Sequence, residues 1–449
     1  MRTRISYAAD RLRNSYWFVP GLMLLGSAVL AWVLTRVDDA SDPQDLPWAG
    51  ELIFSGGATS AHEVLGTISS SMITVAGVVF SITIVTLQLA SSQFGPRMLA
   101  NFMRDRANQM TLGTFVSTFL YSLLVLRKIR DEDPASVPHL SVTVALLLAV
   151  ASLAVLIFFI HHVSTTIQAP NLVAAIAGEL RRTTDHLFPD VREAEHARPA
   201  PAHADLPADF EEHGRRVDAR TTGYVQVLDV ERLVAVAREH DLVIRLDTRP
   251  GRFLVDSTPF ATVYPGDRVA DEVATAVAAS VVTGARRTAQ QDVEFPLRQM
   301  VEIGVRALSP GINDPFTAST CVDQIGAGLC TLAGRELPSP YLVDDDDFLR
   351  VVHGDPVTWE RLVAAGYDQL RQCADSHTPV YLHILDALTR IARCVRDASR
   401  LEPLVREARL VVEAAERNVE AEADQEVVER RYDALLAAVE GFRAGSSPR

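Results

Sequence analysis

The chain has 449 residues, of which 48% are hydrophobic, and its formal net charge is −14 at pH 7. This composition is too apolar for an ordinary soluble enzyme and too polar for a chain that lies wholly in a membrane, so a mixed protein is expected. The acidic balance argues against nucleic acid as a partner.

Four hydrophobic segments have the length that a helix needs to cross a bilayer, about 20 residues. They cover approximately residues 16–35, 65–90, 110–126 and 140–160. Arginines precede the first segment, as in a signal peptide, but its apolar run is too long and no cleavage site of small residues follows. The sequence therefore predicts a transmembrane domain over residues 1–165, with the lipid bilayer as its partner.

The positions of the basic residues predict the orientation of these spans, because Lys and Arg near a span resist translocation. The loop after the first span is acidic, whereas Arg97, Arg104 and Arg106 follow the second span. We therefore expect a multi-pass inner-membrane protein with both termini in the cytoplasm. The segment "RKIRDEDP", which begins at Arg127, disagrees, because it places three basic residues outside.

The chain after the last span is polar, and its sequence pattern divides it into three parts. Residues 166–222 are expected to form a connecting helix and a linker rich in Pro and Ala. Short alternating runs in 223–270 predict a small β-rich subdomain, and 271–449 predicts a mostly helical one. The expected fold class is thus an integral membrane helical domain followed by a cytoplasmic α+β domain.

The second span carries polar residues on one side of a helix. Steps of four and three from Thr67 pass through eight positions, of which two are Val78 and Val85. The other six define the polar stripe: Thr67, Ser71, Thr74, Ser81, Gln88 and Ser92. Two interpretations stay open, a tightly packed interface between helices and a water-filled path lined by copies of this helix. Thr83 and Thr86 lie off the stripe and weaken the segregation.

The segment "QFGPR" follows the stripe. Gly95 and Pro96 are expected to end the helix. Gln93 and Arg97 would lie at the cytoplasmic mouth of a path, where Arg97 either caps the preceding carbonyls or belongs to a basic ring.

The soluble stretch "ALSPGINDPFTA" predicts a turn followed by a helix, with Asp314 as the N-cap and a proline at the first helical position. The free backbone amides of such a junction could also receive an anion or a partner carboxylate. The candidate site for that ligand comprises Arg306, Ser309, Asn313 and Asp314.

No enzymatic motif is present: the sequence contains no GxGxxG that opens a helix, no Walker A segment, no HExxH and no GxSxG. Four cysteines without a CxxC pair predict buried free thiols. We expect no enzyme activity, no metal and no cofactor. The cysteines are Cys321, Cys330, Cys373 and Cys394.

Two long segments, "SITIVTLQLASSQFGPRMLANFMRD" and "VRALSPGINDPFTASTCVDQI", together resemble a bacterial family of predicted membrane proteins called domain of unknown function 2254. The resemblance implies several membrane spans followed by a cytoplasmic domain, and it implies no activity or site residue.

From the polar stripe we expect a homo-oligomeric channel or pore-like transporter for an ion or small solute, with a cytoplasmic domain that assembles or regulates it. The alternative is a scaffold or sensor without transport, whose cytoplasmic domain binds a partner protein or a small anion.

Overall fold

The structure is a computed structural model, which describes residues 17–40, 53–94, 105–129, 137–166, 168–188 and 205–445. The chain divides into two compact units, Met1–Asn171 and Leu172–Arg449. Each unit is described by itself.

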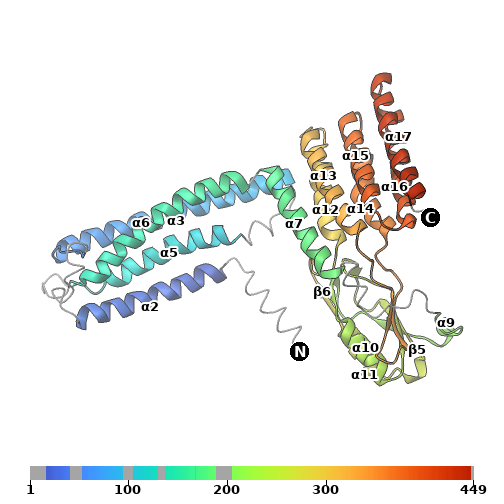
Figure 1. The fold of residues 1–449 in the computed structure, drawn as a ribbon. Coiled ribbons are helices and arrows are strands. Elements are labelled where there is room, and N and C mark those ends of the chain that lie inside the picture. The colour runs from blue at the N-terminus through green and yellow to red at the C-terminus, as the bar shows by residue number, and fades with distance from the viewer. Residues whose placement is uncertain are drawn as a thin grey trace. The chain divides into compact units, whose positions relative to one another are not determined.

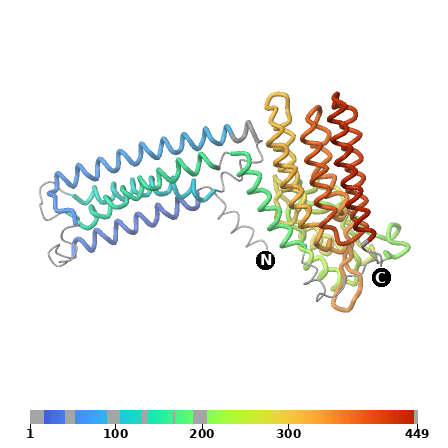
Figure 2. Tube along the Cα trace, turned by 45° about the horizontal axis from the view of Figure 1, so that its top comes forward, coloured from blue at the N-terminus to red at the C-terminus, as the bar shows by residue number. Residues whose placement is uncertain are grey.

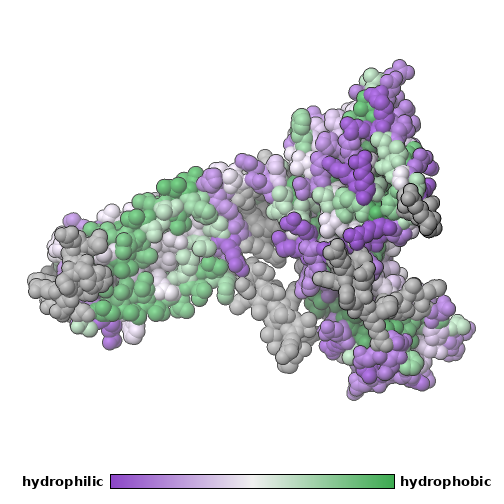
Figure 3. All heavy atoms as spheres, viewed as in Figure 1, coloured by the Kyte–Doolittle hydropathy of each residue, from purple (hydrophilic) through white to green (hydrophobic). Residues whose placement is uncertain are grey.

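The described residues of the first unit include four helices that are each long and apolar enough to cross a membrane (Figure 1). They are α2 (Phe18–Ala40), α3 (Ala58–Phe94), α5 (Arg106–Leu126) and α6 (His139–Thr166). Figure 3 shows hydrophobic residues over most of their visible surface. This arrangement, with the α+β unit that follows, confirms the predicted fold class.

All four helices are longer than the apolar segments that predicted them. The helix α3 has 37 residues, which corresponds to about 55 Å at 1.5 Å per residue. A hydrocarbon core of about 30 Å cannot contain that length. The helix α3 therefore extends beyond the hydrocarbon core, and its first and last turns lie outside the apolar segment 65–90.

The helix α5 lies in the middle of the bundle and packs against α2, α3 and α6 (Figure 1). Ten of its residues are buried, compared with three in α2. Small residues permit this close packing. A Cβ at Gly113 would lie 2.5 Å from the sulfur of Met23 and 3.3 Å from Cα of Pro20.

Polar contacts join the C-termini of α2 and α5 to the N-terminus of α6. They lie at the same end of the bundle as the N-terminus of α3. Asp38 accepts hydrogen bonds of 2.9 Å from the backbone amides of Leu140 and Ser141, and so caps α6. Lys128 forms an ion pair of 2.7 Å with Asp39. One of the three basic residues that disagreed with the predicted orientation thus has an acidic partner from α2.

The described residues of the second unit form two sheets. The larger has the order β1-β5-β3-β8-β7, and all neighbours are antiparallel except β3 and β8. Its strands are β1 (Arg215–Asp218), β3 (Val243–Leu246), β5 (Pro259–Tyr264), β7 (Tyr341–Val343) and β8 (Leu349–His353). The smaller sheet, of order β4-β2-β6, is antiparallel and contains β2 (Gly223–Leu228), β4 (Phe253–Leu254) and β6 (Val281–Gly284).

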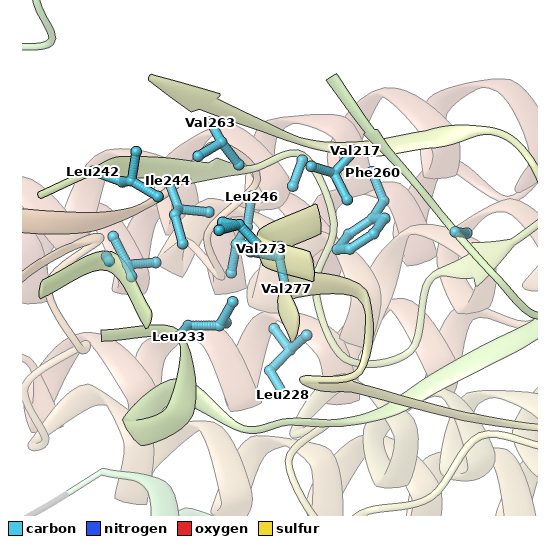
Figure 4. Packing of buried hydrophobic residues seen from close by; sticks show 14 of the residues in the cluster. Val217, Leu228, Leu233, Leu242, Ile244, Leu246, Phe260, Val263, Val273 and Val277 are labelled. Atoms are coloured by element: carbon cyan, nitrogen blue, oxygen red, sulfur yellow. The ribbon is translucent and has the colours of Figure 1, made fainter. Parts of the chain in front are cut away.

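These sheets extend beyond the predicted range 223–270, because β1, β6, β7 and β8 all lie outside it. The helices α10 (Val230–Glu239) and α11 (Asp271–Ala278) contribute to the same apolar core. Figure 4 shows side chains from the strands and from both helices meeting there, including Ile244, Phe260, Leu233 and Val277.

The remaining elements of the second unit are mainly helical. Figure 2 shows α13, α15 and α17 running side by side, and α15 packs against both of the others. The helices are α7 (Ala169–Leu187), α9 (Phe210–His213), α12 (Glu294–Ala307), α13 (Pro315–Ala333), α14 (Trp359–Cys373), α15 (Thr378–Cys394), α16 (Leu401–Asn418) and α17 (Glu422–Gly445), with short 3-10 turns at η4 (Gly266–Arg268) and η5 (Ala398–Arg400).

The four cysteines are free, but the prediction that all are buried is wrong. Cys321 is buried and Cys330 is half-buried, whereas Cys373 and Cys394 are exposed. The exposed thiols occupy the last helical positions of α14 and α15, where the chain leaves the packed core.

Candidate functional site

The helix α3 has one buried face, and that face holds it against the bundle. Its apolar members belong to the core of the first unit: Ala61, Leu65, Ile68, Met72, Ala76 and Val79. Thr83 and Thr86, the two hydroxyls that lie off the polar stripe, are 4% and 3% exposed and lie on this face too. The Oγ1 of Thr83 donates to the carbonyl of Val79 at 2.8 Å, so burial costs it no hydrogen bond.

The polar stripe lies on the opposite face. At 3.6 residues per turn its centre is about 150° around the helix from the centre of the buried face. Ser71, Thr74, Ser81 and Gln88 are all exposed, as is Thr67. The chain's own bundle therefore does not cover the stripe.

The other helices of the bundle present apolar outward faces. In α2, Leu22, Leu25 and Trp32 are highly exposed, and in α6 the same is true of Leu147 and Ile157. Such faces suit acyl chains, because lipid tails form no hydrogen bonds. Among these outward faces the row of hydroxyl and amide groups on α3 is the exception.

One hydroxyl of the stripe and one beside it donate their hydrogen bonds within α3. The Oγ1 of Thr74 donates to the carbonyl of Ser70 at 2.7 Å, and the Oγ of Ser70 donates to the carbonyl of Thr67 at 3.1 Å. A hydroxyl that donates in this way still has oxygen lone pairs facing outward. Threonine and serine can thus line either a helix interface or a wet path.

Gln88 makes a stronger demand on its surroundings. Its amide has two N–H donors and a carbonyl acceptor, which its own helix cannot satisfy together. Within the described part of the chain, no hydrogen bond reaches the Gln88 side chain. Leaving such an amide in hydrocarbon costs roughly 2–7 kcal/mol, so a partner or water is required on this face.

The last residues of the predicted site lie at the edge of the described structure. Ser92 and Gln93 belong to the final turn of α3, but their side chains are outside the described part. Arg97 is outside it entirely. The predicted mouth of Gln93 and Arg97 remains a prediction.

A second set of intramembrane polar groups lies inside the bundle on α5, where sequence reasoning did not place any. The Oγ1 of Thr118 lies 3.2 Å from the Oγ of Ser152, and the Tyr121 hydroxyl donates to the carbonyl of Ser141 at 3.0 Å. Asn108 is 2% exposed, and neither end of its amide has a partner among the described residues. One sequence feature could have indicated these polar groups: the third apolar segment, 110–126, is the shortest of the four, because polar residues interrupt this part of the chain.

The two adjacent histidines at the end of α6 have different surroundings. His162 lies 2.5 Å from a carboxylate oxygen of Asp105, which also caps α5, and its ring stacks on Phe158. His161 is exposed. No group of three or more His, Cys, Asp or Glu in the described ranges could hold a metal ion.

The turn before α13 uses its polar groups internally. Asp314 accepts hydrogen bonds from the backbone amide and the hydroxyl of Thr317, at 3.0 and 2.6 Å. Burial would raise the pKa of Asp314, but these hydrogen bonds hold it below its usual value. The Oγ of Ser309 donates to the carbonyl of Arg306, and Asn313 adopts a left-handed conformation with φ of 50°.

The guanidinium of Arg306 lies 3.9 Å from Glu302 on the same helix. Arg306, Ser309, Asn313 and Asp314 thus each contribute to the turn or to the helices beside it. Binding of a ligand at this turn remains a prediction.

A closed ring of charges in the second unit was not predicted. Arg249 pairs with Glu294 at 2.9 Å and with Asp355 at 3.2 Å, and Arg361 pairs with the same two carboxylates at 3.3 and 2.6 Å. Side chains of Arg249 and Glu294 are 7% and 1% exposed. Burial lowers the pKa of Arg249, while the two carboxylates oppose that shift. The ring connects the β3–β4 loop to α12 and α14.

The fold and the outward polar face together define a class: a multi-span membrane protein with a mixed α+β domain after its spans. The family model described as "Predicted membrane protein (DUF2254)" matches residues 13–390, and the chain belongs to this family. The similar proteins include an uncharacterized protein of Mycobacterium bovis and another of Mycobacterium tuberculosis. Each is 32% identical over 445 residues, which cover 95% of this chain and 81% of the relative. No solved structure matches the chain.

Proposed function

We propose that the protein is a homo-oligomeric channel or pore-like transporter of a bacterial inner membrane, in which copies of α3 line the path. The observation that carries this proposal is the outward position of Ser71, Thr74, Ser81 and Gln88 on an otherwise lipid-compatible bundle. A ring of copies would turn these groups toward one another and toward water, and away from acyl chains. The transported species is an ion or a small solute.

The proposal places both termini in the cytoplasm, because of the arginines that flank the first and second spans. The second unit then acts in the cytoplasm as an assembly or regulatory domain, and the protein has no catalytic activity. The sequence supports the last point in that it lacks the nucleotide, metal-protease and hydrolase motifs.

Flux through purified protein in liposomes tests the transport proposal. Replacing Ser81→Leu or Gln88→Leu should lower the flux about tenfold, the effect of an added barrier of about 1.4 kcal/mol. The elution volume of the purified oligomer should stay unchanged. Ile84→Leu is the matched control, because Ile84 is exposed beside the stripe and the change conserves volume.

Two results would contradict the transport proposal. One is a correctly assembled wild type that passes neither ions nor small solutes under voltage, tension or concentration gradients. The other is a flux that both leucine variants leave unchanged.

A scaffold or sensor is the second candidate function, and the tip of the α12–α13 hairpin favours it. Phe316 is 86% exposed and Ile312 is 46% exposed, on either side of the Asp314 cap. Exposed aromatic and aliphatic side chains are common anchors in protein contacts. Under this alternative, Phe316→Ser would abolish capture of a partner protein while the oligomer stays intact.

A further inference from the structure

Glu63 continues the polar face of α3 toward the start of the helix. It lies one turn before Thr67, and at 100° per residue it falls within the angular range of the stripe. Its side chain is exposed, while Ala61 and Leu65, its neighbours on the other face, are fully buried. The carboxylate therefore projects from the same side of the helix as the hydroxyls and the amide of the stripe.

Several charged side chains described at this end of the bundle are engaged elsewhere, whereas the exposed Arg127 at the end of α5 has no ion pair within the described ranges. Lys128 pairs with Asp39, and Asp38 caps α6. The guanidinium of Arg36 lies over the ring of Trp32, 5.4 Å from its centre. No ion pair or hydrogen bond within the described ranges reaches the Glu63 carboxylate. Among the described residues it is thus an unpaired negative charge on the outward face.

The rest of the stripe is neutral, because it consists of hydroxyl and amide groups. A single carboxylate per copy is then the only formal charge along this face between residues 63 and 88. The positive end of the α3 dipole lies nearby, but it amounts to about half an elementary charge. The full charge of Glu63 outweighs it.

The loop that precedes α3 has the same sign, although Arg127 and Lys128 follow α5 at this end. Residues 37–63 contain six Asp and Glu and no Lys or Arg. A field of this sign concentrates cations and repels anions as they approach.

Resting on the proposed function, we infer that Glu63 is the residue that makes the path selective for cations. Copies of α3 arranged around a path place one Glu63 each at the mouth that precedes the stripe. Rings of Asp or Glu select cations in this way, because the carboxylates stabilise an entering cation and raise the energy of an anion. The neutral hydroxyls and amides that follow would solvate the cation along the path.

The test is the reversal potential of purified full-length protein in a planar bilayer with a threefold gradient of KCl. The wild type should reverse near the potassium equilibrium potential. Glu63→Gln, which conserves shape, should move the reversal potential at least halfway toward zero, while current persists. Glu63→Asp keeps the charge and should behave like the wild type. Because Glu63 is exposed and has no ion pair with any described residue, all three proteins should elute alike.

The outcomes separate this inference from the proposed function. A wild type that reverses near the chloride potential, or a Glu63→Gln variant with unchanged reversal, overturns the role of Glu63 and leaves the channel standing. A wild type that carries no current overturns the channel, and the selectivity role falls with it.

Discussion

Glu407 is a carboxylic acid held almost entirely out of solvent on α16. It pairs at 2.9 Å with Arg371 of α14, which also binds Asp368. Burial raises the pKa of Glu407 to about 7, and the ion pair offsets only part of this shift. The residue thus changes charge within the physiological range.

The raised pKa predicts that the stability of the second unit falls as the pH rises. The unfolded chain releases the Glu407 proton near pH 4.5 and the folded chain near pH 7, so the folded state binds more protons in this window. The contribution of Glu407 to the free energy of unfolding is complete below pH 4.5. It is lost by about pH 7, and it amounts to at most about 3 kcal/mol.

The measurement is the melting temperature of the detergent-solubilised protein at pH 5 and at pH 7.5. Glu407→Gln cannot ionise, so its melting temperature should drop less over this range than that of the wild type. Glu360→Gln serves as the control, because Glu360 forms an exposed pair with Arg406. Equal pH dependence in the wild type and Glu407→Gln would refute the assignment.

The buried ring formed by Arg249, Glu294, Asp355 and Arg361 acts at the scale of elements, because it joins a sheet loop to two helices. Removal of one partner from a buried ion pair costs about 3–5 kcal/mol, since the other charge remains in a dry site. Glu294→Gln should therefore lower the free energy of unfolding by roughly 3 kcal/mol.

Chemical denaturation of the purified protein measures this loss. The control is Glu302→Gln. Glu302 lies on the same helix and pairs with Arg306 over a longer distance and with more exposure, so the change should lower the free energy of unfolding by under about 1 kcal/mol. If the two variants lose equal stability, the ring does not hold the sheet loop to the helices.

The elements that sequence could predict are those defined by local periodicity. Four apolar runs predicted four long helices, because the bilayer fixes their minimum length. The spacing of Ser81 and Gln88 likewise predicted one polar face. It could also have predicted that Thr83 and Thr86 are buried, since both share a face with Met72 and Val79.

Long-range pairing left no such local signal. The parallel contact of β3 with β8 joins Ile244 to Val351, more than 100 residues later, so the range 223–270 could not include it. The charge ring draws from three separate segments of an Arg-rich and Asp-rich sequence. Nothing in the spacing of Arg249 and Glu294 distinguishes them from neighbouring solvent-exposed charges.

At the scale of the whole molecule, the outward faces of the described transmembrane helices are apolar except on α3. The helix α5 is the most buried of the four, while α2 and α6 present leucine, isoleucine and tryptophan outward. Only the outward face of α3, within the described helices, combines hydroxyls, an amide and a carboxylate at one angular position. Such a face is expected to meet either a second copy of the chain or water.

Particle images of the purified protein in lipid nanodiscs test this central claim most directly. The account predicts a symmetric ring of copies in which the side of α3 bearing Thr74, Ser81 and Gln88 faces the symmetry axis and α2 lies at the lipid boundary. A monomer, or a ring with α3 at its rim and these groups against lipid, would contradict it.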